Sequence, residues 1–478
     1  LSLMKNSVIY LLNTAISFHQ KGFLSDAERL YKKILRINDR NFDAIHLLAT
    51  LYAQKGKYDA ALKFFNLAIS INPNFPDIFI NRGNIFRENN YFEAALNDYQ
   101  HAIDLDPGLI HSYIGKATIF NLTTEYQHAV DSLKIALEID RNNFLANINI
   151  AFALQNLGLF SDSCEKYKTA INLNPNFDYL LGSYAHVLLL DSNLSNINYY
   201  KKIICDRVVK NLKPIVPICL LSIEDSPELQ QMAACSFTLD KYPPSPLLPT
   251  ISHKPHDRVR IAYFSSDFRS HAVSYLIAEL FELHDRNRFE IYGFSLIKLS
   301  PEDSMSQRLR SAFDHFYEVA ERSPLEIAQL ARSLEIDITI DLNGHTQGAQ
   351  TAVFAYRTAP IQINYLGYPG TMGATYMDYI IADQHLIPPQ NRPFYTEKII
   401  YLPNSFQVND SKRKKVSSNL KRLDLNLPSD GFLFCCFNNT YKINLEMLHT
   451  WAEILKQAPN SYLWLLSVAP SAENNLRN

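Results

Sequence analysis

Several residue types are scarce in this chain, and each scarcity excludes a class of protein. Only 6 cysteines occur in 478 residues, without CxxC spacing. This argues against a disulfide-rich secreted domain and a zinc site, and favours a reducing, cytoplasmic location. No apolar run reaches the roughly 20 residues of a membrane helix. With 46 Lys+Arg against 48 Asp+Glu, the net charge of −2 gives no bulk attraction to nucleic acid or anionic membranes.

The length and the start of the chain set further bounds. At 478 residues and 47% hydrophobic content, it can bury large cores, and about three domains are expected. The apolar run at 8–18 is interrupted by Asn13 and Thr14 and keeps the repeat phase given below, so it predicts a repeat helix and not a signal peptide. The first residue is Leu1 and the earliest methionine is Met4, so we expect a longer reading frame.

A 34-residue repeat is present in the N-terminal third. Small side chains recur every 34 residues at Ala27, Ala61, Ala95, Ala129 and Ser163, and upstream at Ala15, Ala49, Gly83, Ala117 and Ala151. Larger side chains recur at Tyr31, Phe65, Tyr99, Leu133 and Tyr167. This pattern matches tetratricopeptide repeats, in which small residues let paired helices cross closely. It predicts about five helix pairs over residues 8–190.

One polar position of the repeat is a candidate for peptide binding. Two residues before the upstream small residue, the sequence reads Asn13, Leu47, Asn81, Gly115 and Asn149. In a superhelix this position can face the inner groove, where an amide both donates to and accepts from a peptide backbone. The alternative is that these asparagines are simply exposed polar residues of an asparagine-rich protein.

The pattern changes after the repeats. Residues 191–250 lose the repeat phase and predict a helical transition, which ends in an extended segment with four prolines among residues 242–249. From residue 258 to 410, short β-branched or aromatic runs alternate with amphipathic helices, which predicts a Rossmann-like parallel sheet covered on both faces. The expected strands are 259–264, 289–294, 336–340, 361–365, 379–381 and 398–401, with helices at 274–283 and 325–334 among them.

A second α/β unit is predicted over residues 431–478. It contains the expected strands 432–437 and 462–466 and the helix 445–457. Two strands and one helix are too few for a doubly wound core, so we expect this Rossmann-like domain to be incomplete. Residues 411–430 are the expected linker, and their basic run Lys412-Arg413-Lys414-Lys415 is more typical of a solvated linker than of a nucleic-acid signal.

Glycine is also scarce, yet it clusters after two predicted strands. Of 14 glycines, Gly344, Gly348, Gly367, Gly370 and Gly373 lie within 30 residues. Such clustering predicts that the backbone turns tightly or approaches a ligand there. Neither cluster is GxGxxG opening a helix, so a dinucleotide site is not indicated.

Two loops carry candidate chemical groups. His271 follows the first strand and precedes a helix, whose N-terminus disfavours an imidazolium and leaves a neutral ring able to accept a proton; the alternative is a loop histidine bound to backbone. Lys442 follows the first strand of the second unit, and Asn444 is a plausible N-cap of the next helix. Lysine beside free helix-end amides can bind a diphosphate, although a lone surface lysine is the simpler interpretation.

These residues together resemble a known family. Repeats followed by RVRIAYFSSDFRSH, DLNGHT, APIQINYLGYPGTMGATYMDYIIAD and FNNTYKINLEMLHTWAEILKQAPNSYLWLL are similar to the O-GlcNAc transferase and SPINDLY group of inverting glycosyltransferases. The resemblance covers almost the whole chain. It implies a multidomain protein, with an all-α tetratricopeptide superhelix followed by an α/β region of the GT-B type. It also implies transfer of a sugar from a nucleotide diphosphate to Ser or Thr of proteins.

The resemblance implies roles for individual residues. His271 matches the family histidine at the junction of donor and acceptor, and Lys442 matches the lysine that neutralises the leaving diphosphate. Asn439 stands where animal members have a glutamine near the donor. Other expected donor contacts are His345, Thr346, Gly367, Pro369 and Gly370, and Asn13, Asn81 and Asn149 match an asparagine ladder for acceptor peptides, which Leu47 and Gly115 interrupt.

The implied reaction is one displacement at the anomeric carbon, with no metal and no cofactor. The expected partners are a protein or peptide acceptor and a nucleotide sugar, UDP-GlcNAc, or GDP-fucose as in similar plant members. Because the family's nucleoside contacts lie mostly beyond the matching residues, little turnover is expected from this chain alone. The alternative is a tetratricopeptide scaffold without chemistry.

Overall fold

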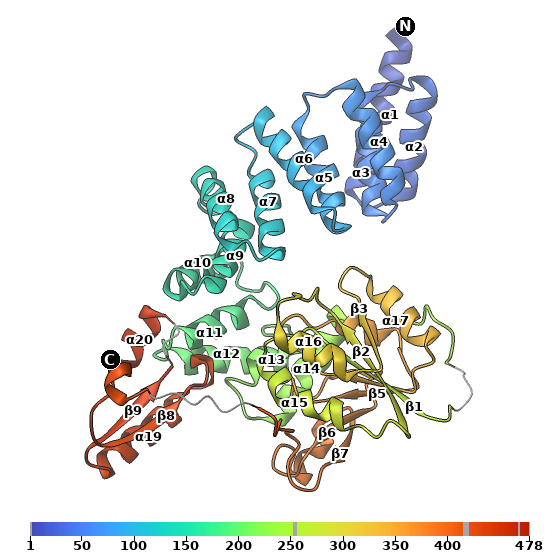
Figure 1. The fold of residues 1–478 in the computed structure, drawn as a ribbon. Helices are drawn as coiled ribbons and strands as arrows, with labels where there is room; N and C mark the ends of the chain where they lie inside the picture. The colour runs from blue at the N-terminus through green and yellow to red at the C-terminus, as the bar shows by residue number, and fades with distance from the viewer. Residues whose placement is uncertain (1, 252–255, 414–419, 467–468, 478) are drawn as a thin grey trace. The chain divides into compact units, whose positions relative to one another are not determined.

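The computed structural model describes residues 2–251, 256–413, 420–466 and 469–477 (Figure 1). By their internal contacts the residues divide into two compact units, Leu1–Pro175 and Asn176–Asn478. The first unit is all helical, and the second combines helices with two parallel sheets. Among the described residues, no helix has both the length and the apolar character needed to cross a membrane.

Five antiparallel helix pairs make up the first unit, as the repeat predicted. Their ten helices are α1 (Ser2–Gln20), α2 (Leu24–Ile37), α3 (Phe42–Gln54), α4 (Tyr58–Ile71), α5 (Pro76–Glu88), α6 (Phe92–Leu105), α7 (Ile110–Leu122), α8 (Tyr126–Ile139), α9 (Phe144–Asn156) and α10 (Phe160–Leu173). Each first helix contacts the second helix of its own pair and the first helix of the next pair. Successive first helices therefore line one side of the stack.

The buried ring of Tyr99 limits the size of a neighbouring small repeat position. A Cβ atom at Gly83 in α5 would lie 3.0 Å from Cε1 of Tyr99, which is itself fully buried. The Tyr99 hydroxyl donates to Asn84 Oδ1 at 2.7 Å. Ala27, Ala61, Ala95, Ala129 and Ser163 are likewise all fully buried.

The second unit opens with four helices, α11 (Leu180–Leu190), α12 (Ile197–Val209), α13 (Pro217–Leu220) and α14 (Pro227–Lys241). The sequence placed residues 180–190 at the end of the repeats, but the contacts group α11 with the second unit. Gly182 shows why, because a Cβ atom there would lie 2.6 Å from Ile215 Cα. Helix α11 therefore packs closely on the segment before α13 and does not continue the 34-residue repeat.

A seven-stranded parallel sheet follows, in the order β3-β2-β1-β4-β5-β6-β7. Its strands are β1 (Val259–Ser265), β2 (Phe289–Ser295), β3 (His315–Glu318), β4 (Ile338–Asp341), β5 (Ile361–Asn364), β6 (Tyr379–Ala382) and β7 (Lys398–Tyr401). Both ends of each of the six predicted strands lie within two residues of the observed ends. The edge strand β3 was missed.

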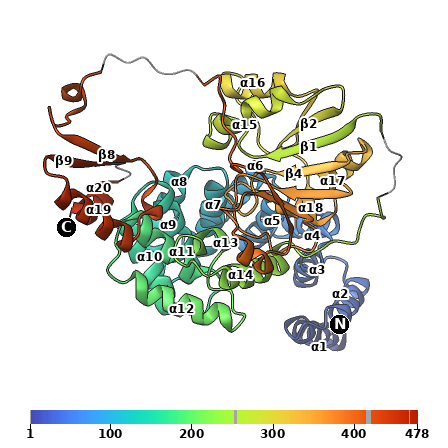
Figure 2. The ribbon, with the colours of Figure 1, turned by 90° about the horizontal axis from the view of Figure 1, so that it is seen from below.

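Helices cover both faces of this sheet, as predicted (Figure 2). The helices α15 (Ala272–Leu283) and α16 (Ser304–Ala312) pack on one face, and α17 (Pro324–Ser333) and α18 (Thr351–Ala355) pack on the other. Alternate residues of β1 enter the two cores, with Ile261 and Tyr263 facing α15 and Ala262 and Phe264 facing α17. Two faces buried in this way explain the nearly continuous apolar strands.

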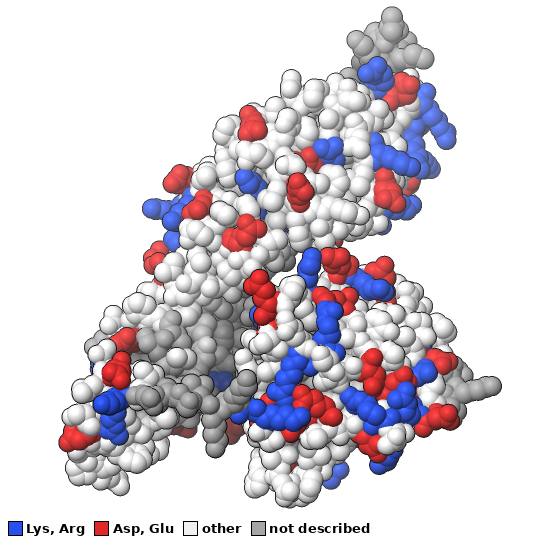
Figure 3. Space-filling view, in the orientation of Figure 1, with Lys and Arg blue, Asp and Glu red and all other residues white. Residues whose placement is uncertain are grey.

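Charged residues of opposite sign lie side by side on the visible surface over α15 and α16 (Figure 3). Arg308 of α16 pairs with Glu282 at 2.8 Å and with Asp410. Lys412, in the expected linker, pairs with the same Glu282 at 2.6 Å. The start of that linker is thus bound to α15, while Lys414 and Lys415 lie outside the described residues.

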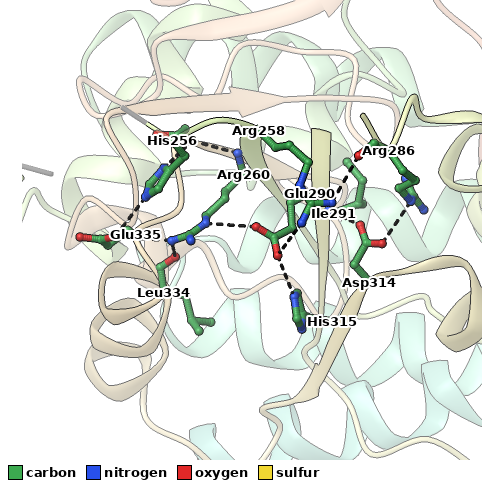
Figure 4. Close-up of polar contacts among 11 residues, drawn as sticks. His256, Arg258, Arg260, Arg286, Glu290, Ile291, Asp314, His315, Leu334 and Glu335 are labelled. Carbon is green, nitrogen blue, oxygen red and sulfur yellow. Dashed lines mark hydrogen bonds and ion pairs between the residues drawn. The ribbon is translucent and has the colours of Figure 1, made fainter. Parts of the chain in front are cut away.

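A network of ion pairs ties together the amino-terminal ends of the strands (Figure 4). Glu290 of β2 pairs with Arg260 of β1 at 3.2 Å and with His315 of β3 at 3.0 Å. His256 lies between Glu335 Oε2, at 3.0 Å from Nε2, and Asp337 Oδ2, at 3.2 Å from Nδ1. The hydrogen bond with Glu335, followed by that with Asp337, raises the pKa of His256.

We expect His256→Gln to lower Tm more at pH 6 than at pH 8.5. Because folding raises this pKa, the stabilisation is complete below the unfolded value of about 6.5 and is lost as the pH rises through the folded value. An ion pair near the surface contributes at most about 1 kcal/mol, so the shift in Tm should be at most about 2 °C for a unit of this size. Calorimetry at both pH values tests this, and Glu335→Gln should remove part of the same pH dependence. Equal losses at both pH values would contradict it.

The described C-terminal segment forms a smaller α/β unit. It contains η2 (Arg422–Leu425), the parallel pair β8 (Phe432–Cys436) and β9 (Ser461–Leu465), the short η3 (Thr440–Lys442), α19 (Leu445–Gln457) and α20 (Pro470–Arg477). Asn444 caps α19 as predicted, since its Oδ1 accepts from Met447 N at 2.8 Å. Thr440 Oγ1 donates to Leu190 O at 2.7 Å, and Asn475 Nδ2 donates to Asp191 O at 2.7 Å, which ties this segment to the end of α11.

Candidate functional site

The topological switch point of the large sheet lies between β1 and β4, and Asn343 bridges it. The chain runs outward from β1 to β2 and β3 and then returns to β4 on the other side of β1. Such points open a crevice at the carboxyl ends of the strands, where α/β proteins bind ligands. The fully buried Asn343 accepts from Ser266 N at 2.7 Å and donates to Ser266 Oγ and Asp267 Oδ2, both at 2.9 Å.

His271 caps helix α15 beside this bridge. Its Nδ1 accepts the N–H of Val273 at 3.3 Å and lies 3.6 Å from Asp267 Oδ2. The side chain is 39% exposed, whereas that of Asp267 is 10% exposed. With Nδ1 directed at its own helix and at Asp267, the ring leaves Nε2 for a ligand. The position before a helix agrees with the sequence analysis.

The loop before His271 is held from both sides. Ser274 Oγ of α15 donates to Asp267 O, and Ser306 Oγ of α16 donates to Phe268 O at 2.8 Å. Ser270 donates through both its N and its Oγ to the carboxylate of Asp303, at 2.6 and 2.8 Å. This loop therefore presents His271 from a rigid support, as a catalytic side chain requires.

Asp341 at the end of β4 is buried, and it forms no ion pair with any of the residues that the structure describes. Its Oδ1 accepts from Asn343 N at 2.9 Å and Gly344 N at 3.1 Å, while Oδ2 has no hydrogen-bond partner among the described residues. Burial raises the pKa of this carboxyl to about 6. Asp341 thus shapes the turn that carries Asn343, at an electrostatic cost.

The structure places His345 inside the protein and not at an open surface. The residue is 7% exposed, and its Nε2 lies 2.9 Å from Met372 O. Its ring packs edge-on against Phe237 of α14 and Tyr368, with centroids 5.2 and 5.1 Å apart. Burial lowers the pKa of His345 to about 4, so the ring is neutral and donates from Nε2. In this position the ring holds the loop at Met372, and its expected contact with a donor stays a prediction.

The glycine-rich loop after β5 approaches its own chain closely. A Cβ atom at Gly367 would lie 2.1 Å from Leu342 O, and one at Gly370 would lie 2.6 Å from the hydroxyl of Tyr368. The buried Glu397 fixes the same loop by accepting from Thr371 Oγ1 and Met372 N, both at 2.6 Å. This close packing agrees with the tight backbone expected from the clustered glycines, and a donor contact of Gly367 and Gly370 stays a prediction.

The other expected donor contacts of this region lie near the loop surfaces. Thr346 is half-buried, and its Oγ1 donates to Asn343 O at 3.0 Å. Pro369 is also half-buried and accepts from the Tyr395 hydroxyl at 3.2 Å. Both residues lie in loops that follow the carboxyl ends of the central strands β4 and β5.

Lys442 and Asn439 lie at a different location from His271, in the loop that follows the carboxyl end of β8. Both are exposed, and Lys442 lines a cavity of about 580 Å³ together with Asn438, Phe434 of β8 and Trp451 of α19. The η3 turn is fixed by Thr440 and by Tyr441, whose ring centroid lies 5.2 Å from that of His186. Among the described residues, no hydrogen bond or ion pair links Lys442 or Asn439 to His271.

The three repeat asparagines lie on first helices of pairs, with different environments. Asn13 of α1 is exposed. Asn81 of α5 is half-buried, with its Nδ2 at 3.2 Å from His46 Nε2. Asn149 of α9 is half-buried as well, and its backbone oxygen accepts from Asn121 Nδ2 at 3.2 Å. None of the three is fully buried, and all lie on the helices that line one side of the stack.

Comparison with known proteins agrees with this arrangement. The model of glycosyl transferase family 41 matches residues 243–424 and 414–478, and three tetratricopeptide models match residues 30–63, 49–90 and 76–109. The α/β region belongs to glycosyl transferase family 41. His271, Asn343 and Lys442 all lie within the family 41 match.

Relatives of this family 41 chain include three proteins named for the same activity. Two from Arabidopsis thaliana are named probable UDP-N-acetylglucosamine-peptide N-acetylglucosaminyltransferases: SEC is 38% identical over 55% of this chain, and SPINDLY is 32% identical over 44%. One from Caenorhabditis elegans, a UDP-N-acetylglucosamine-peptide N-acetylglucosaminyltransferase, is 38% identical over 32%. The matches span 28%, 23% and 13% of the respective relatives.

A solved structure shares the order of repeats and α/β region. A mutant O-GlcNAc transferase of Thermobaculum terrenum superposes with a TM-score of 0.57, covering 84% of this chain and 71% of that one at 23% identity. At this identity the likeness concerns the fold. It agrees with tetratricopeptide helices followed by a parallel-sheet glycosyltransferase region.

Three polar residues near His271 were not singled out from the sequence. Asn343 and Asp341 belong to the DLNGHT motif and Asp267 to SSDFRSH, but their partners are visible only in the fold. A signal was available, because buried polar residues directly after two central strands seldom lack a positioning role.

Proposed function

We propose that this protein is an inverting protein O-glycosyltransferase, which transfers N-acetylglucosamine from UDP-GlcNAc to Ser or Thr hydroxyls. The observation that carries the proposal is the position of His271, in a family 41 segment, on a rigid loop at the switch point of the sheet. The names of the relatives SEC and SPINDLY support UDP-GlcNAc as the donor.

The proposed reaction is a single displacement. The acceptor hydroxyl attacks the anomeric carbon while its proton passes to His271 Nε2, and the bond to the diphosphate oxygen breaks with its electron pair leaving on the diphosphate. Lys442 and the backbone amides near the start of α19 stabilise the charge that develops there. Because these groups carry positive potential, we propose that the reaction needs no metal.

The remaining parts have supporting roles in this proposal. The α/β region adopts the GT-B arrangement, with His271 in the first domain and the donor phosphates held near Lys442, Asn439 and the second domain. The first helices of the repeats bind acceptor proteins, with Asn13, Asn81 and Asn149 contacting peptide backbone. The six cysteines show no CxxC spacing, which supports a reducing, cytoplasmic setting.

Titration calorimetry with UDP-GlcNAc, UDP and GDP-fucose tests the proposal, using the protein at the length that its gene encodes. We expect UDP-GlcNAc and UDP to bind and GDP-fucose not to bind. A preference for GDP-fucose would make the protein a fucosyltransferase. If none of the three binds, the protein is better described as a tetratricopeptide scaffold.

A further inference from the structure

A buried carboxylate faces Nδ1 of His271. Asp267 Oδ2 lies 3.6 Å from His271 Nδ1, and the residue is 7% exposed. The same oxygen accepts from Asn343 Nδ2 at 2.9 Å. The nearest cation, Arg269, approaches the other oxygen, with Nη2 at 4.0 Å from Oδ1. Oδ2 is therefore held in place and free to accept from the ring.

Two groups compete for His271 Nδ1. The N–H of Val273 is within hydrogen-bond distance, and the Asp267 carboxylate, at 3.6 Å, comes within that distance after a small rotation of the ring. In one neutral form, Nδ1 accepts the N–H of Val273 at 3.3 Å, and the ring proton is on Nε2. In the other, the ring proton is on Nδ1 and points to Asp267. Only the second form leaves Nε2 with a lone pair, which a base needs at that atom.

Charge and burial favour the second form. A hydrogen bond to a carboxylate is roughly twice as strong as one between neutral groups, and a buried setting strengthens it further. Val273 is half-buried in the first turn of α15, so water can take over its N–H.

We propose that Asp267, anchored by Asn343, is the positioning residue that selects the Nδ1–H tautomer of His271 and so makes Nε2 the proton acceptor. This rests on the proposed function, because a base is needed only if a hydroxyl is activated there. When Nε2 takes the acceptor proton, Asp267 also stabilises the resulting imidazolium. No proton moves to Asp267 itself in this step.

The tautomer can be measured directly by NMR on the whole chain with ¹³C,¹⁵N-labelled histidine, with His271→Gln to assign the signal. At a pH where the ring is neutral, we expect the Nδ1–H form to exceed the Nε2–H form by about fivefold to tenfold. Asp267→Ala should invert this ratio. Asn343→Ala should reduce the ratio, because it frees the carboxylate to turn away.

Ser266→Ala is the matched control. It removes one bond to Asn343 but touches neither Asp267 nor His271, so the tautomer ratio should stay as in the native chain. If Asp267→Ala misfolds, Asp267→Asn replaces it, since it keeps the shape and loses the charge. A native chain with the Nε2–H form in excess, or a ratio that Asp267 variants leave unchanged, would overturn the inference.

The measurement uses no donor and no turnover. A wrong tautomer therefore rejects this inference while donor binding by calorimetry still tests the glycosyltransferase proposal. Conversely, failure of donor binding leaves the tautomer result standing as a property of the loop.

Discussion

Lys442→Ala is expected to lower the rate of sugar transfer by about two to three orders of magnitude. In other enzymes, a hydrogen-bonding side chain that stabilises charge appearing only in the transition state contributes this much to the rate. Lys442 is exposed beside the cavity at the end of β8, and its Nζ lies 5.9 Å from the ring centroid of Tyr441. Its charge is thus available to a diphosphate.

The rate is measured with UDP-GlcNAc and a serine-containing peptide, on the protein at the length that its gene encodes. Lys456→Ala is the matched control, because Lys456 lies exposed in the last turn of α19 and pairs with Glu453 at 2.8 Å. It should leave the rate unchanged. If both variants keep the native rate, Lys442 does not stabilise the leaving group.

Asp341→Asn is expected to stabilise the protein at pH 7.5 and to change it little at pH 4. Burial raises the pKa of Asp341 from 3.8 to about 6, so the folded state holds the proton more tightly than the unfolded state. Stability therefore falls as the pH rises from about 4 to about 6 and stays lower above that. The rise in pKa corresponds to a cost of up to roughly 3 kcal/mol. The uncharged asparagine should recover the part of this cost that exceeds the loss from burying its Nδ2 without an acceptor at the position of Oδ2.

Thermal unfolding at both pH values tests this expectation. Asp314→Asn is a useful comparison, because Asp314 accepts from Ile291 N at 2.8 Å and pairs with Arg286 at 3.3 Å. It should lose stability at neutral pH instead of gaining it. An equal change in Tm for Asp341→Asn at pH 4 and pH 7.5 would show that burial of charge is not the cause.

The elements that were predictable depend on neighbours close in the sequence. The 34-residue spacing predicted the five helix pairs because buried residues such as Ala95 and Tyr99 pack within their own helix pair and against the next pair. β1 and β2 were predicted because buried strands read as apolar, β-branched or aromatic runs. The edge strand β3 contains only four residues, His-Phe-Tyr-Glu, and its two aromatic residues are too short a run to distinguish a strand from a loop, so its pairing with β2 was missed.

The candidate site shows the opposite case. Clustered glycines correctly indicated tight backbone, but only the fold shows that Gly367 is small because Leu342 O lies against it. His345 has the same local setting as a ligand-binding histidine, yet helix α14 covers it from more than 100 residues away. The surroundings of both Gly367 and His345 are therefore set by packing between segments that are far apart in the sequence.

The sequence by itself determined the repeat architecture, the parallel α/β class, the helix start at His271 and the cap at Asn444, because periodicity and capping act over a few residues. The tertiary structure decided which polar groups meet. Asn343 reaches Ser266 and Asp267 across 77 and 76 residues because the strand order places β4 beside β1. That adjacency anchors the buried carboxylate of Asp267, which lies four residues before His271 in the same loop, and no spacing in the sequence encodes this anchor.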